Sequence, residues 1–161
     1  MVAERHDPRR TGARGLRLRA EDADDLAVIS ACLQDAVTSR AQMRWQQKER
    51  RFAMLVNRYR WERQGGERIR AGLHFDGVEK VVTRDLDGVG PDQVLSLLAI
   101  ASSGREEGRA RITLVFAGGP LVRLEAECID ASLNDIGEGW MTPRHPDHGE
   151  DPTSGRDGEG G

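Results

Sequence analysis

The chain has 161 residues, of which 37% are hydrophobic and 32% are charged, with a formal net charge of −3. This length suits one domain with a buried core and is too short for two. No apolar run approaches the length of a membrane span, and the first ten residues contain no hydrophobic stretch of a secretory signal. The two cysteines, Cys32 and Cys128, do not make a disulfide scaffold. These features predict a soluble cytoplasmic protein with reduced thiols.

Both ends of the chain differ in composition from its middle. Residues 1–14 show no apolar pattern, and residues 149–161 consist of small, charged or turn-forming residues. Neither end buries enough apolar surface to offset the entropy of ordering, so we expect a disordered head and a disordered acidic tail. The folded part is then a single domain over residues 15–148.

The first elements of that domain are a short strand and a helix. "LRLRA" at 16–20 alternates apolar and basic residues, as an edge strand does. Asp22 then suits a helix N-cap, and Leu26, Ile29 and Leu33 recur at helical spacing. The pattern predicts a helix over about 22–34.

Strand patterns follow, over 36–46 and 51–62. In the second, Phe52, Met54 and Val56 share one parity, whereas Leu55 and the aromatic residues at 59 and 61 share the other. Two explanations stay open: both faces of this strand are covered, or a bulge near residue 57 changes its phase.

Further strand patterns occupy most of the remaining chain. Residues 68–77 alternate cleanly, and 78–86 continue that strand or pair with it through a turn at Asp76–Gly77. Residues 94–102 fit a buried strand better than a helix, and 110–128 predict a hairpin around Gly118–Gly119. Residues 129–137 return to helical spacing and end at Gly137.

This order of elements predicts an α+β fold. It has about seven mostly antiparallel strands in a barrel or sandwich like that of pleckstrin-homology domains, with an N-terminal helix and a C-terminal helix. The comparison concerns the order of elements and carries no function.

The stretch "WMTPRHPDH" at 140–148 raises the question of a metal or acid–base site, since His145 and His148 lie close together. Two prolines prevent a helical ligand spacing there, and no third ligand is near in sequence unless folding brings His74 close. We therefore expect no catalytic residues, no metal and no cofactor, and keep an enzyme or metalloprotein using these three histidines as a minor alternative. Trp140 is expected to anchor the end of the chain on the domain.

Residues 40–70 hold ten Lys and Arg residues against three Glu residues, interleaved with aromatic side chains. This region is the part of the sequence that most resembles a binding surface. Alternatively, its arginines only solvate the outer face of strands. The candidate partner-binding residues are Arg44, Arg58, Arg60, Trp61 and Arg70.

Several segments together resemble a bacterial family of uncharacterised proteins, domain-of-unknown-function family 2948, found mainly in alphaproteobacteria. These segments are "LRLRAEDADDLAVISACLQDAV", "NRYRWE", "GVEKVVTRDLDG", "VLSLLAI" and "ITLVFAGGPLVRLEAECIDASLNDIG". The resemblance covers about residues 16–148. It implies a bacterial, cytoplasmic, single-domain protein and leaves the activity open.

Our first functional hypothesis is a non-enzymatic binding or adaptor domain that uses a sheet face or edge to engage a protein, either a second copy or another chain. The alternative is a single-stranded nucleic-acid binder that uses the basic strands over 40–70. No membrane partner is expected.

Overall fold

The computed structural model describes residues 2–3, 15–61, 66–104 and 109–141, with 2–3 and 138–141 followed by their backbone alone. Within these residues the chain forms eleven strands in one sheet and a single α-helix. The strands are β1 Val2–Ala3, β2 Arg17–Ala20, β3 Val37–Thr38, β4 Met43–Gln46, β5 Arg51–Tyr59, β6 Glu67–Asp76, β7 Val78–Arg84, β8 Leu95–Gly104, β9 Ala110–Phe116, β10 Leu121–Ala126 and β11 Ala131–Met141. A short 3-10 helix, Arg40–Gln42, precedes β4.

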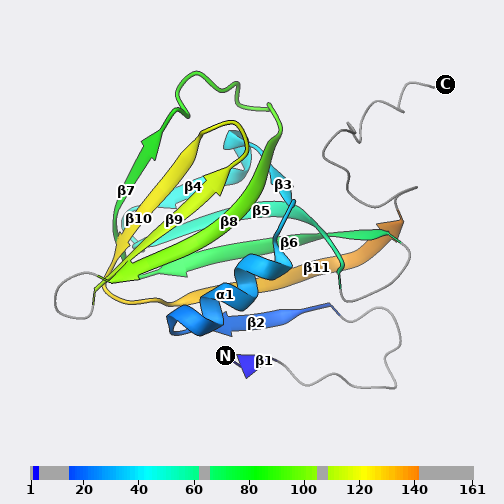
Figure 1. Cartoon of the computed structure of the whole chain (residues 1–161), viewed down its shortest axis with the longest axis horizontal. Helices are drawn as coiled ribbons and strands as arrows, with labels where there is room; N and C mark the ends of the chain where they lie inside the picture. The colour runs from blue at the N-terminus through cyan, green and yellow to red at the C-terminus, as the bar shows by residue number, and fades with distance from the viewer. Residues whose placement is uncertain (1, 4–14, 62–65, 105–108, 142–161) are drawn as a thin grey trace.

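The strand order across the sheet is β1-β2-β11-β6-β5-β3-β8-β9-β10-β7, with β4 paired to β5 beside β3, and every pairing is antiparallel. The two-residue strand β3 bridges β5 and β8, and so joins two halves of the sheet. Figure 1 shows β7, β10, β9 and β8 lying over β4, β5, β6 and β11. The chain passes from one half to the other at Gly77, which has a φ of +72° and separates β6 from β7.

The core lies between the two halves because each strand alternates apolar and polar residues. Every second residue of β5, β6, β9 and β10 is buried. Phe75 of β6 and Phe116 of β9 are the largest buried apolar side chains of the two halves, at 0% and 1% exposure. One continuous apolar cluster results, and it also includes residues of the helix.

The helix α1, Ala23–Cys32, begins where the sequence predicts it. Asp22 caps it by accepting a hydrogen bond from the Asp25 backbone N–H to Oδ1 at 2.8 Å. Leu26 and Ile29 are buried on the side that packs against β8 and β2 (Figure 1). The Ser30 hydroxyl accepts a hydrogen bond from the Ile100 N–H of β8 at 2.9 Å, so the helix covers part of an otherwise open strand edge.

The predicted fold class is wrong in three respects. The described residues hold eleven strands rather than about seven and one α-helix rather than two, and they form an open sheet, because its end strands β1 and β7 do not pair with each other. The one helix lies near the N-terminal end of the domain, and the described residues contain no second helix at its C-terminal end. The comparison with a pleckstrin-homology barrel or sandwich is therefore not supported.

The predicted C-terminal helix over 129–137 is strand β11. Its helical spacing is accidental, since Ala131 and Leu133 also alternate with period two and both are fully buried. β11 lies between β2 and β6 and pairs with both. A strand in that position hydrogen-bonds on both sides, and this long-range pairing overrides a weak local helical pattern.

Three other predicted strands are confirmed, whereas residues 78–84 form β7, which pairs with β10 and makes no hairpin with β6. Residues 94–102 are a strand, now β8, and the hairpin over 110–126 is β9 and β10. The pattern over 36–46 is interrupted, because β3, the 3-10 helix and β4 share it. The expected disordered head and tail lie outside the described residues, apart from Val2–Ala3.

Candidate functional site

The strands β11, β6, β5 and β4 turn one set of side chains into the core and the other set to the outside. The outward set forms a surface that we call the outer face. Its members are Ser132, Asn134 and Ile136 of β11, Arg68, Arg70, Gly72, His74 and Asp76 of β6, Arg51, Ala53, Leu55, Asn57 and Tyr59 of β5, and Arg44 and Gln46 of β4. Tyr59 has the outward parity of this set but is covered, with 2% exposure. The pairing of β5 with β6 runs without a register shift from Arg51 to Tyr59, so the two strands keep their parity throughout.

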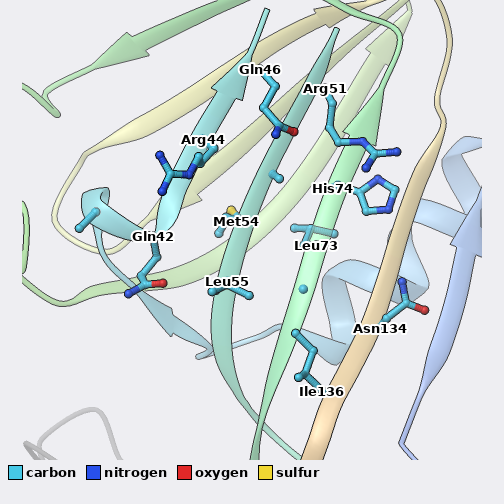
Figure 2. A pocket seen from close by; sticks show the side chains of 13 residues that line it. Gln42, Arg44, Gln46, Arg51, Met54, Leu55, Leu73, His74, Asn134 and Ile136 are labelled. Carbon is cyan, nitrogen blue, oxygen red and sulfur yellow. The ribbon is translucent and has the colours of Figure 1, made fainter. Parts of the chain in front are cut away.

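A hollow of about 390 Å³ lies in the middle of the outer face (Figure 2). Gly72, Ala53 and Leu55 form its floor, and Ile136, whose side chain is 48% exposed, borders it. A Cβ atom at Gly72 would lie 3.6 Å from Ile136 Cδ1, an ordinary contact, so the missing side chain leaves open space. The volume of the hollow lies near the lower end of the range for pockets that hold a ligand or a partner's side chain.

The rim of this hollow is polar, with Arg44, Arg51 and His74 beside Gln42, Gln46 and Asn134. Figure 2 shows Arg51 extending over β6 toward His74, with Gln42 and Arg44 on the opposite side. Asp76 holds Arg51, whose Nε donates to Oδ1 at 2.7 Å. His74 Nδ1 lies 3.1 Å from Oδ2 of the same carboxylate but makes no hydrogen bond with it. Arg44 is exposed and has no ion pair with any described residue. The rim thus combines one oriented pair of basic groups with an uncompensated arginine.

A smaller hollow of about 190 Å³ adjoins the first and shares Leu55 and Gln42 with it. Asn57 and Arg70 line it from the outer face, and Asp92 lines it from the loop before β8. Arg70 Nε donates a long hydrogen bond of 3.5 Å to Asn57 Oδ1 and makes no ion pair with Asp92. The outer face therefore continues as a furrow across β5 toward β3 and the loop before β8, beside the far end of β6.

Arg68 lies at that far end, two residues from Arg70 on the same face of β6. Its guanidinium carbon is 5.9 Å from the centre of the Tyr59 ring, and the Tyr59 and Trp61 rings meet edge to face at 4.6 Å. The Nη1 atom of Arg68 is enclosed by protein and donates no hydrogen bond. Burial lowers the pKa of Arg68, and the carboxylate of Asp35 opposes this shift in part. The cation is thus held here without the partner that a buried guanidinium normally has.

Two of the five predicted binding residues do not reach the surface. Arg58 has the parity of Phe52 and Met54, and its side chain is 0% exposed. Its Nε and Nη2 donate to Asp135 Oδ1 and Oδ2 at 2.8 and 2.7 Å, and Asp135 is 1% exposed. The same carboxylate accepts the Leu16 N–H at 2.7 Å. This bidentate pair ties β5 and β11 to the start of β2 and has a structural role.

Arg60 is likewise enclosed, with its side chain 2% exposed and its Nη1 donating to Glu67 Oε2 at 3.0 Å. Trp61 is 45% exposed and donates from Nε1 to the Gln34 carbonyl at 3.3 Å. Of the predicted residues, Arg44 and Arg70 lie on the outer face, and Trp61 lies at its end beside Tyr59. The structure therefore separates the set into a surface group and two internal ion pairs.

The histidines do not come together within the described residues. His74 lies on the outer face, whereas His145 and His148 fall outside the described part of the chain. The same holds for the side chain of Trp140, although its backbone pairs with Arg68 in β11. No group of three His, Cys, Asp or Glu side chains suited to a metal ion occurs among residues 15–61, 66–104 and 109–137.

Sequence reasoning missed Gly72, Ile136 and Arg68. The sequence did contain a signal for Gly72, because a glycine inside an alternating strand marks a place where the surface lacks a side chain. Ile136 was assigned to a helix and so could not be placed on this face. Arg68 was counted only as part of the basic region, because no local pattern shows which arginines find an acidic partner.

The chain was compared with known proteins. The model of a family described as "Protein of unknown function (DUF2948)" matches residues 16–148. The chain belongs to this family. No curated protein and no solved structure matches it. Within the described residues, no helix is long and apolar enough to cross a membrane.

The family match covers both the outer face and the buried Arg58–Asp135 pair, since all of their residues lie between 16 and 148. The family description assigns no activity, so the chemistry of the site rests on its geometry. That geometry combines an apolar floor, a polar rim and an open furrow, which suits recognition of a ligand by contact and charge.

Proposed function

We propose that this DUF2948 protein is a non-enzymatic binding domain that holds a segment of a protein partner on its outer face. The supporting observation is the hollow over Gly72, where exposed Ile136 borders an apolar floor inside a polar rim. Exposed apolar surface rimmed by polar groups is typical of a protein-interaction site. The adjoining furrow extends this surface across β5 toward β3, which suits an extended segment.

The charge of the outer face indicates the chemistry of the partner. The chain as a whole carries −3, yet Arg44 and Arg70 stand on this face without an ion pair to any described residue. Acidic groups on the partner would complement both arginines and speed association. The segment that fits has a large apolar side chain for the hollow and acidic residues beside it.

A nucleic-acid ligand receives less support from the same face. Two of the arginines invoked for it, Arg58 and Arg60, are enclosed in ion pairs. Trp45 and Phe52 of β4 and β5 pack on the core side and Tyr59 is covered, which leaves Trp61, at the end of the outer face, as the one exposed ring of these four aromatic residues for stacking. Single-stranded DNA therefore serves as a competing probe in the test.

The test is a display selection of random ten-residue peptides against the full chain, followed by calorimetry with the selected peptides. We expect a consensus with one large apolar residue and neighbouring acidic residues. Gly72→Val fills the hollow with a residue suited to a strand, and should weaken binding by roughly tenfold or more. The Gly72 position has no positive φ and no close contact, so this variant should fold normally.

A matched charge control is available on the other half of the sheet. Arg44→Glu and Arg84→Glu change the net charge equally, and Arg84 is an exposed residue of the edge strand β7. Peptide binding should fall in the first variant and stay unchanged in the second. Equal effects of both, unaltered binding by Gly72→Val, or selection of single-stranded DNA over every peptide would refute the proposal.

A further inference from the structure

We infer that Arg68 and Arg70 form an anion subsite on β6 beside the furrow, which takes a phosphate or carboxylate group of the partner. The inference rests on the proposed function for the identity of the partner, whereas the subsite itself rests on separate observations.

The first observation is that two cations stand side by side on one face. Arg68 and Arg70 alternate on β6, which places their Cβ atoms about 7 Å apart. Neither makes an ion pair with a described residue. Two arginine side chains that start this close together on one face can both reach a single oxyanion, which would accept several of their hydrogen bonds.

The second observation is the state of Arg68 itself. Its side chain is partly buried, with the guanidinium carbon 5.9 Å from the centre of the Tyr59 ring, and its Nη1 is enclosed without a hydrogen-bond partner. A polar group in that state costs stability. Nitrogen atoms of Arg60, His74, Arg111 and Arg123 are enclosed in the same way, so what distinguishes Arg68 is its position beside Arg70 on the outer face.

Other charged groups near the subsite do not satisfy it. Asp35 acts on Arg68 through space, yet the pKa of Arg68 is still lowered, so burial outweighs this attraction. Asp92 lines the smaller hollow with Arg70 but forms no ion pair with it. Asn57 adds a side-chain amide next to Arg70, and amide N–H groups also bind oxyanions.

The subsite and the hollow lie on one line. Gly72 lies two residues from Arg70 and four from Arg68 along β6, which corresponds to about 7 to 14 Å. In an extended partner segment this distance separates residues two to four positions apart. The recognised segment therefore carries an apolar residue and an anionic residue at that spacing.

Inorganic phosphate is the probe for the subsite, titrated into the full chain at constant ionic strength. The Nε–H signals of the arginines are followed by NMR. We expect saturable shifts of the Arg68 and Arg70 signals and none for Arg84. Arg70→Gln should weaken phosphate binding roughly tenfold, as expected for loss of one charged hydrogen-bonding group. Arg68→Met should do the same without lowering the unfolding midpoint.

Two variants separate this inference from the proposed function. Gly72→Val should leave phosphate binding unchanged and remove peptide binding. If phosphate does not bind, or binds equally to Arg70→Gln, while peptides still require Gly72, the subsite is refuted and the binding domain stands. If Gly72→Val binds peptides normally but phosphate saturates the arginines, the proposed use of the hollow fails and the anion subsite stands.

Discussion

Arg58 and Arg68 lie on neighbouring strands of one hairpin, on opposite faces of it. Arg58 faces the core and donates from Nε and Nη2 to the carboxylate of Asp135 and from Nη1 to the Tyr59 carbonyl, with both charged side chains at most 1% exposed. Arg68 faces outward, keeps an enclosed Nη1 without an acceptor, and has an aromatic ring as its contact. An arginine with a structural role, such as Arg58, is paired with a buried carboxylate of the same chain. An arginine without one is more informative about function, because its surroundings leave a hydrogen-bonding need unmet.

The largest effect should come from breaking the internal pair. Asp135→Asn leaves Arg58 charged and enclosed, and the unfolding free energy should fall by about 3–5 kcal/mol. Urea unfolding followed by circular dichroism measures the change. The double variant Arg58→Met, Asp135→Leu removes both charges and should recover much of the loss. A single variant as stable as the native chain would show that the pair has no structural role.

A smaller loss is expected at the second internal pair. Glu67 is 16% exposed, so water screens the charge of Arg60 after Glu67→Gln better than it screens Arg58. The unfolding free energy should fall by about 1–2 kcal/mol, since the Arg60 N–H to Glu67 carbonyl bond of 2.8 Å remains. The same urea experiment, performed beside Asp135→Asn, tests the ranking. A larger loss here than at Asp135 would contradict the link between burial and cost.

The smallest effect, and the one of opposite sign, is expected for Arg68→Met. Because burial lowers the pKa of Arg68, its charged form is less favourable in the folded chain than in the unfolded chain. Arginine keeps its proton in both states over the usual working range, so this cost should not vary with pH there. Removing the charge should leave stability unchanged or raise it, by less than about 1 kcal/mol. Thermal unfolding measures the sign, and a clear loss would assign Arg68 a structural role.

Much of this contrast was available from parity in the sequence. Arg58 continues the row of Phe52, Met54 and Val56, and β5 has no bulge in its pairing with β6, so that row points inward to its end. A reading that keeps strict period two therefore buries Arg58 and demands an acid for it. The hypothesis that grouped Arg58 with Arg70 on one face ignored this alternation.

The partner of Arg58 could not have been found locally. Asp135 is 77 residues away and lies in a segment whose apolar spacing indicated a helix. The strand conformation of β11 follows from its place between β2 and β6, a tertiary context that single-segment patterns do not contain. By contrast, α1 and the β9–β10 hairpin depend on a cap and a tight turn within their own residues, and both were predicted correctly.

The position of β11 also has a consequence for synthesis. β2 pairs with β11 and with the two-residue strand β1, and Asp135 alone accepts the Leu16 N–H across 119 residues of sequence. A ribosome-bound chain that ends before residue 131 contains the residues of β2 and α1 but lacks β11, the strand with which β2 pairs. The strand β2 must therefore wait for nearly the last part of the fold to emerge, whereas α1 can already pack on β8. In that interval the edge of β2 is the surface that a chaperone would meet.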